Sequence, residues 1–192
     1  MNNIEYTKEL VERKFAVLET TVIDQYQISF LLKKDDVHHL LSTLKLDGWK
    51  QLSYLSAIDW PEEKVFEIVY ILMNWEKAVH VQIRTKIDRD NPVMESILPI
   101  FPGAKYYERE CNEFFGVHFP GNPDYMKQLI LEEWDDIPPL RKDFDPRAYS
   151  DAHFPKRVYE DKSTVLNGQP SKQEKRKARK ERVKKLSKGG RK

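Results

Sequence analysis

The sequence predicts an α+β fold: a mainly antiparallel sheet with helices packed on one face, followed by an extended C-terminal arm and a basic tail. Short runs rich in β-branched and aromatic residues alternate with segments whose apolar residues recur at helical spacing. Prolines recur beyond Trp134 without a periodic apolar face, and Lys and Arg dominate from Ser171. We therefore divide the chain into an α+β domain (1–134), an extended partner-binding arm (135–170) and a tail (171–192) too polar to order alone.

The first third of the chain predicts a helix, a hairpin and a second helix. Residues 4–14 place their apolar side chains on one side of a short helix. Two β-rich runs, 15–23 and 25–32, are separated by a single aspartate, which indicates a hairpin. Asp36 and the aspartate before it offer an N-cap to a helix with leucines at helical spacing, and Gly48 ends that helix.

Three strands and one helix are predicted next. The strand runs are 51–58, 65–73 and 78–87, and the last two alternate well enough to indicate an antiparallel pair. Pro92 then follows Asp-Asn and suits the first position of a helix, where its missing N–H costs little. A Pro-Gly pair at 102–103 ends this predicted helix.

A second helix is predicted over 104–115, because its apolar residues fall on one face at a period of 3.6. Gly116 is well placed as its C-terminal cap. Glu108 and Glu110 then border the apolar stripe on its two sides. Arg109 lies opposite the stripe, so we expect it to be solvated or to meet a partner.

The chain beyond this helix predicts one short strand, at 128–131, and then the arm. The prolines before residue 141 suppress helix, so the Arg-Lys-Asp-Phe run at 141–144 directs successive side chains to different sides. An aromatic ring beside an arginine and an aspartate is a common form of interface anchor. A solvated turn fits the same composition equally well.

Charge is divided sharply along the chain. Residues 171–192 hold 12 Lys or Arg and 2 Asp or Glu, whereas residues 1–170 hold 21 and 29. Basic clusters bind nucleic acid or anionic membranes, but 171–192 has no aromatic residue for base stacking, so no specific nucleic-acid recognition is predicted. The longest apolar run, 68–73, is far shorter than the ~20 residues that span a bilayer.

No catalytic, cofactor-binding or metal-binding residue is predicted. The single cysteine, Cys111, lies mid-helix on the apolar face near two glutamates, a setting that raises a thiol pKa. One cysteine also excludes an Fe–S cluster or a Cys-rich zinc site made by this chain alone. His38 and His39 point about 100° apart on a helix, so they cannot chelate one metal together. The dispersed glycines form no phosphate-binding loop.

Two motifs resemble the signature of one family, the 30-kDa subunit of respiratory complex I, an NADH:quinone oxidoreductase. The first comprises Glu108-Arg109-Glu110, Phe114-Phe115-Gly116-Val117, Phe119, Gly121 and Pro123; the second comprises Trp134 and Pro139-Leu140-Arg141-Lys142-Asp143-Phe144. The runs at 52–72 and 85–110 look like the family's too, so the resemblance covers roughly residues 20–148. The pair at 111–112 and the stretch 135–138 depart from the family pattern, which leaves the subfamily open.

The resemblance implies a cofactor-free structural subunit in the peripheral arm of such a complex. It would brace the large quinone-site subunit and the small Fe–S subunit, and the Fe–S clusters would lie in those partners. The chain would sit on the cytoplasmic face of the membrane, attached only through the complex. On this basis we predict that a partner interface involves Glu108, Arg109, Glu110, Trp134, Arg141, Lys142, Asp143 and Phe144.

Two alternatives remain open. Membrane-bound nickel–iron hydrogenases, F420H2 dehydrogenases and sulfur-reducing complexes have homologous subunits, and a hydrogenase-type large partner would carry two Cys-x-x-Cys pairs. From a different class, the chain could be a nucleic-acid-binding module with a basic tail. Its binding would weaken steeply with salt and vanish on deletion of residues 171–192. The electron donor, the electron acceptor and the coupling ion would belong to other subunits.

Overall fold

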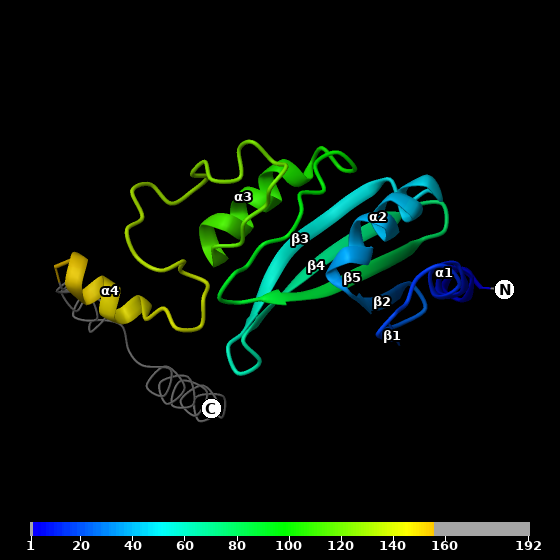
Figure 1. The fold of residues 1–192 in the computed structure, drawn as a ribbon, viewed down its shortest axis with the longest axis horizontal. Coiled ribbons are helices and arrows are strands. Elements are labelled where there is room, and N and C mark those ends of the chain that lie inside the picture. The colour runs from blue at the N-terminus through cyan, green and yellow to red at the C-terminus, as the bar shows by residue number, and fades with distance from the viewer. Residues whose placement is uncertain (1, 156–192) are drawn as a thin grey trace, which may run out of the picture. The chain divides into compact units, whose positions relative to one another are not determined.

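The computed structural model describes residues 2–155, which form a five-stranded sheet with the strand order β1-β2-β5-β4-β3 (Figure 1). The strands are β1 (Glu19–Val22), β2 (Gln27–Leu32), β3 (Gln51–Trp60), β4 (Val65–Asn74) and β5 (Val79–Asp88). The helices are α1 (Asn3–Glu12), the 3-10 turn η1 (Lys34–Asp36), α2 (Val37–Leu46), α3 (Ala104–Phe115) and α4 (Pro146–His153). The predicted tail 171–192 and the later part of the predicted arm lie outside the described residues.

The structure divides after Pro146 into two compact units. The first contains the whole sheet with α1, α2 and α3. Described by itself, the second unit begins with α4, in which the ring of His153 stacks on Tyr149 with 4.0 Å between centroids. Helix α4 falls in a stretch predicted to be extended. Its first residue is a proline, whose fixed φ and missing N–H suit the first position of a helix.

The sheet is mainly antiparallel, as predicted. β1 pairs with β2, β3 with β4, and β4 with β5 in antiparallel register, and the β4–β5 pair runs from Val65↔Asp88 to Asn74↔Val79. One pair, β2 with β5, is parallel. It arises because α2 carries the chain over the sheet from β2 to β3, and β4 and β5 then fold back into the gap between them.

One face of the sheet is covered by α2 and α3, so the predicted one-sided helix packing is confirmed. Alternate residues of β4 that face these helices are fully buried: Phe66, Ile68, Tyr70 and Leu72. The four apolar residues at helical spacing in α2 are buried as well. The opposite face is more polar, and at its centre Arg84 binds the side chains of Glu67, Ser29 and Glu19.

Three local predictions were wrong, and in two of them longer-range hydrogen bonds replace the expected local ones. Residues 92–101 form no helix, since the amides of Met94 and Ser96 donate to the carbonyls of His118 and Pro120. Residues 128–131 form no strand, because the amides of 129–131 donate to a side chain of α3 described below. The side chain of Asp36 makes no capping hydrogen bond at α2. Helix α3 itself is confirmed, and Gly116 caps it in the left-handed conformation with φ 77°.

Candidate functional site

The first signature residue, Glu108, lies inside the domain. Its carboxylate accepts hydrogen bonds from Ser96 Oγ (2.7 Å), the amide of Ile97 (2.8 Å) and Asn122 Nδ2 (2.8 Å). The side chain has no exposed surface, so Glu108 lies inside the domain and not at the border of the apolar stripe as expected; its part in a partner interface stays a prediction. Burial raises the pKa of this carboxyl above its usual range, although the three donors act against that rise. Glu108 therefore joins the two irregular segments on either side of α3.

Arg109 and Glu113 both bind the backbone of one loop, Arg109 as a donor and Glu113 as an acceptor. The guanidinium of Arg109 donates to the carbonyls of Lys127 and Gln128. One turn further along α3, Glu113 accepts from the backbone amides of the next three residues, 129–131, at 2.9–3.1 Å. Arg109 does point away from the core, as predicted, but it meets a loop of its own chain. Contact between Glu110 and a partner stays a prediction.

Replacing Glu113 with glutamine is expected to lower the free energy of unfolding by about 1 kcal/mol, because a neutral acceptor binds amides less strongly than a carboxylate. The loop should open more often, so trypsin should cut after the exposed Lys127 several-fold faster. Urea unfolding and timed digestion measure both effects. Glu110→Gln makes the same change on the same helix, where no described amide donates to the side chain, and should leave both unchanged. Equal cleavage of the two variants would contradict the assignment.

The end of the sheet carries a second cluster, centred on Asp59. This residue is the penultimate one of β3, and its carboxylate has no exposed surface. Arg89, which follows β5, binds it with two hydrogen bonds, from Nε at 2.7 Å and from Nη2 at 2.9 Å. The amide of Lys142 donates to the same carboxylate at 2.8 Å, and Arg89 also reaches Asp143 at 3.0 Å. We call Asp59, Arg89, Arg141, Asp143 and the Lys142 amide the Asp59 cluster.

Burial opposes the charged form of Asp59, but the hydrogen bonds from Arg89 and the Lys142 amide and the nearby positive charges outweigh it and lower its pKa. A depressed folded-state pKa gives stability that is present above the unfolded value of about 3.9 and lost as the pH falls further. The cluster is thus intact at neutral pH.

The remaining signature residues of the second motif also contact the chain itself. Arg141 donates from Nε to the carbonyl of Phe115 at 2.7 Å, and its guanidinium lies over the buried ring of Phe66 at 5.2 Å. The rings of Trp134 and Phe144 meet edge to face at 5.4 Å. Trp134 Nε1 donates to a carbonyl three residues further on. Residues 123–144, which we call the strap, are therefore fastened to the domain at several points.

What the strap leaves exposed is mostly apolar or acidic. Four large apolar side chains are 40–69% exposed: Met126, Ile130, Ile137 and Leu140. Tyr106 of α3, which lies beneath the guanidinium of Arg109, is exposed as well. The side chain of Lys142 points to solvent, and only its backbone is used in the cluster. These outward residues are the ones available to a partner.

The groups tested for chemistry in the sequence can be placed among residues 2–155. Cys111 is buried, and burial raises the pKa of its thiol far above its usual range, with Glu110 and Glu108 adding to the rise. No group of three or more His, Cys, Asp or Glu in this part of the chain could hold a metal ion. None of its helices has the length and apolar character needed to cross a bilayer.

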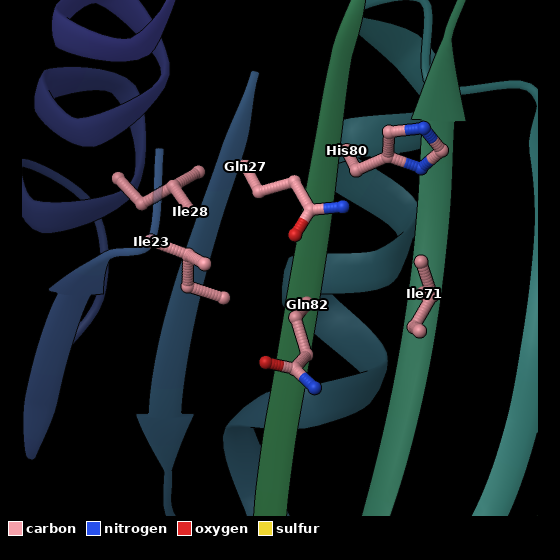
Figure 2. A pocket seen from close by; sticks show the side chains of 6 residues that line it. All are labelled: Ile23, Gln27, Ile28, Ile71, His80 and Gln82. Carbon is pink, nitrogen blue, oxygen red and sulfur yellow. The ribbon is translucent and has the colours of Figure 1, made fainter. Parts of the chain in front are cut away.

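Two hollows on the described surface differ in size. One, on the sheet face opposite α2, measures about 60 Å³ and is lined by Ile23, Gln27, Ile28, Ile71, His80 and Gln82 (Figure 2). Ligand sites usually measure about 300–1,000 Å³. Another, of about 340 Å³, lies against α1 and the residues after it and is lined by Tyr6, Glu9, Leu10, Arg13 and Lys14.

Comparison with known proteins identifies the family. The model of the family described as respiratory-chain NADH dehydrogenase, 30 Kd subunit, matches residues 30–150. The chain belongs to this family. The matched region contains α3, the Asp59 cluster and the whole strap.

Curated relatives in the same family come from bacteria and from a mitochondrion. The C subunit of NADH-quinone oxidoreductase from Moorella thermoacetica is 32% identical over 117 residues, which are 60% of this chain and 78% of that protein. Its counterpart from Rhizobium johnstonii is 32% identical over 119 residues, or 60% and 58%. The 30.4 kDa subunit of NADH-ubiquinone oxidoreductase from Neurospora crassa is 36% identical over 107 residues, or 55% and 37%. The chain thus matches between 37% and 78% of the length of these relatives.

Solved structures share the fold. A chain of a membrane-bound sulfane sulfur reductase, described as an archaeal respiratory membrane complex, is 30% identical and aligns with a TM-score of 0.74 over 82% of this chain and 94% of that one. A trypsin-resistant fragment of Nqo5 aligns with a TM-score of 0.52 at 19% identity over 64% of this chain and 98% of the fragment. This second likeness concerns the fold alone.

Sequence reasoning about this family member missed Asp59, Arg89 and Glu113. A signal for Asp59 was present, because side chains alternate between the two faces of a strand and Asp59 falls on the same face as Leu55 and Ala57, which are buried. A buried carboxylate requires a partner, which points to an arginine near the same end of the sheet. Nothing comparable marks Glu113, whose partners are backbone amides of an irregular loop.

Proposed function

We propose that this chain is a cofactor-free structural subunit in the peripheral arm of a membrane-associated, complex I-type NADH:quinone oxidoreductase. It braces a large quinone-site subunit and a small Fe–S subunit at the cytoplasmic face of the membrane. Electron transfer takes place in those partners, and this chain holds them in position relative to each other. Family membership and the names of the relatives support the type of complex.

One observation carries the bracing role. The charged signature residues Glu108, Arg109 and Arg141 bind atoms of this chain, and Arg109 and Arg141 hold a strap that turns apolar side chains outward. An active site would direct such groups into a cleft around a reacting atom. Rigid presentation of exposed apolar residues suits the core of a protein–protein interface.

Co-isolation tests this proposal. An affinity tag on the chain in its own host, followed by mild-detergent extraction of membranes, should recover a multisubunit assembly that contains Fe–S clusters and reduces quinone with NADH. Leu140→Glu combined with Ile130→Glu should abolish recovery of the partners without changing the stability of the isolated chain. Leu46→Glu alters an apolar residue of α2 that is 90% exposed and should have no effect. Recovery of wild type only as a free monomer would overturn the proposal.

A second candidate is the equivalent subunit of another membrane-bound respiratory complex. The likeness to a chain of the sulfane sulfur reductase, which covers more of this chain than the three curated relatives do, favours it. Metal analysis and activity of the same purified assembly separate the candidates. Nickel in the assembly would indicate a hydrogenase-type complex, and reduction of sulfane sulfur without quinone reduction would indicate a sulfur-reducing complex.

A further inference from the structure

The Asp59 cluster joins two parts of the chain that are far apart in sequence. Asp59 and Arg89 belong to the ends of β3 and β5, whereas Arg141, Lys142 and Asp143 belong to the strap. The two carboxylates and two guanidinium groups balance in charge. Phe66, on the strand between β3 and β5, lies under both guanidinium groups, at 5.7 Å from that of Arg89 and 5.2 Å from that of Arg141.

The half of the cluster on the sheet is complete without the strap. Arg89 and Asp59 form a bidentate ion pair with two hydrogen bonds, which fixes both side chains. The backbone of Arg89 is fixed as well, because its amide donates to the carbonyl of Lys64 in the β3–β4 turn at 3.1 Å. The sheet therefore holds a preformed receptor for the strap.

The half on the strap is held more weakly. Asp143 is 54% exposed, so its ion pair with Arg89 is screened by water. The Lys142 amide makes a charge-assisted bond to Asp59, and the amide of Leu140 donates to the carbonyl of Phe114 at 3.0 Å. Opening of residues 138–144 would break these contacts and those of Arg141 with Phe115 and Phe66, whereas the hydrogen bonds between the strands would remain. Local opening of this kind can occur while the domain stays folded.

We propose that the Asp59–Arg89 pair is an assembly latch, which closes the strap into the conformation that the partner subunits bind. This inference rests on the proposed function, because it assigns the strap to the partner interface. A strap that is already ordered spares the partners the entropy of ordering it. The apparent Kd for partners rises as the closed fraction falls, so the latch sets how readily the subunit joins a complex. Asp59 and Arg89 are positioning residues here and touch no partner themselves.

Amide hydrogen exchange of the purified full-length chain tests the latch without any partner. Asp59→Asn keeps the size of the side chain but replaces one oxygen with an NH2 group that opposes Arg89. We expect exchange of the Leu140 amide, which does not contact Asp59, to accelerate at least 100-fold, toward the rate of an unstructured peptide. Asp143→Asn should accelerate it about 10-fold, and amides of β4 should be unchanged in both. Unchanged exchange at Leu140 in both variants would overturn the latch.

Glu63→Gln is the matched control, because it removes a carboxylate from an exposed ion pair with Lys86 beside the same end of the sheet. It should leave exchange at Leu140 as in wild type. If Asp59→Asn also exposes the amides of β4, the variant has lost the domain, and Asp143→Asn on the strap alone decides the outcome.

Affinity for the assembly that lacks this subunit tests the second half of the inference. The apparent Kd should follow the order wild type and Glu63→Gln, then Asp143→Asn, then Asp59→Asn, and the last should be at least 10-fold weaker than wild type. Faster exchange with unchanged affinity would overturn the assembly role. Absence of wild-type binding would instead refute the proposed function, and exchange at Leu140 would still report whether the strap is latched.

Discussion

Replacing Glu108 with alanine is expected to lower the free energy of unfolding by about 3–5 kcal/mol, because it removes one member of a buried, charge-assisted network. Ser96 Oγ, the Ile97 amide and Asn122 Nδ2 would each lose the acceptor that they share. The Glu108 side chain has no exposed surface, so this network lies away from bulk water. Urea unfolding of the isolated chain measures the loss.

Glu108→Gln separates shape from charge. The glutamine side chain has nearly the same size but only one acceptor atom, and its NH2 group would face three other donors. We therefore expect the free energy of unfolding to fall by an intermediate amount, about 2 kcal/mol. Glu110→Ala, two residues along the same helix, should cost less than about 1 kcal/mol. Equal losses at the two positions would contradict the role given to Glu108.

The difference in stability between wild type and Glu108→Gln is expected to depend on pH. The folded-state pKa of Glu108 is raised, so between the unfolded value of about 4.3 and the folded value the native state binds more protons than the unfolded state. Stability from this group therefore increases as the pH falls through that window. The advantage of wild type over Glu108→Gln should grow as the pH is lowered from 7 toward about 4.3, while other carboxyl groups cancel in the difference.

Replacing Gly116 with alanine is expected to cost about 2 kcal/mol and to loosen the strap. The residue caps α3 at φ 77°, a left-handed conformation that costs about 1 kcal/mol or more for a residue with a Cβ. An added Cβ would also lie 2.7 Å from Nη2 of Arg141 and 3.2 Å from Cγ of Pro138. Arg141 would have to give up the Phe115 carbonyl and the face of Phe66 to make room.

Two variants isolate the causes at Gly116. Asparagine tolerates the left-handed conformation but keeps the Cβ, so Gly116→Asn should retain most of the effect on the strap with less backbone strain. Gly103→Ala introduces a Cβ that meets no atom within 4 Å and should be neutral or slightly stabilising. Urea unfolding reports stability, and amide exchange at Leu140 reports the strap. A loss at Gly116 no larger than at Gly103 would rule out this account.

Periodicity was enough to predict the sheet and α3, since both depend on alternation or 3.6-residue spacing within one segment. Pro92 and the aspartate-asparagine pair before it are sound local signals for a helix, yet the amides of Met94 and Ser96 bond to the carbonyls of His118 and Pro120, more than 20 positions away. The predicted strand at 128–131 failed in the same way, through a carboxylate on α3. Arg109 was placed correctly on its helix, but a helix pattern does not say which loop will cover it.

In this subunit, the residues that hold the strap in place are different from the residues that the strap exposes. Arg109, Asp59 and Arg141 hold the strap, whereas the side chains of Met126, Ile130, Ile137 and Leu140 are turned outward. Substitutions among the latter could therefore adapt the subunit to a new neighbour while its fold stays intact. A scaffold of this kind can be recruited repeatedly during evolution, which fits a family whose fold recurs in a sulfane sulfur reductase.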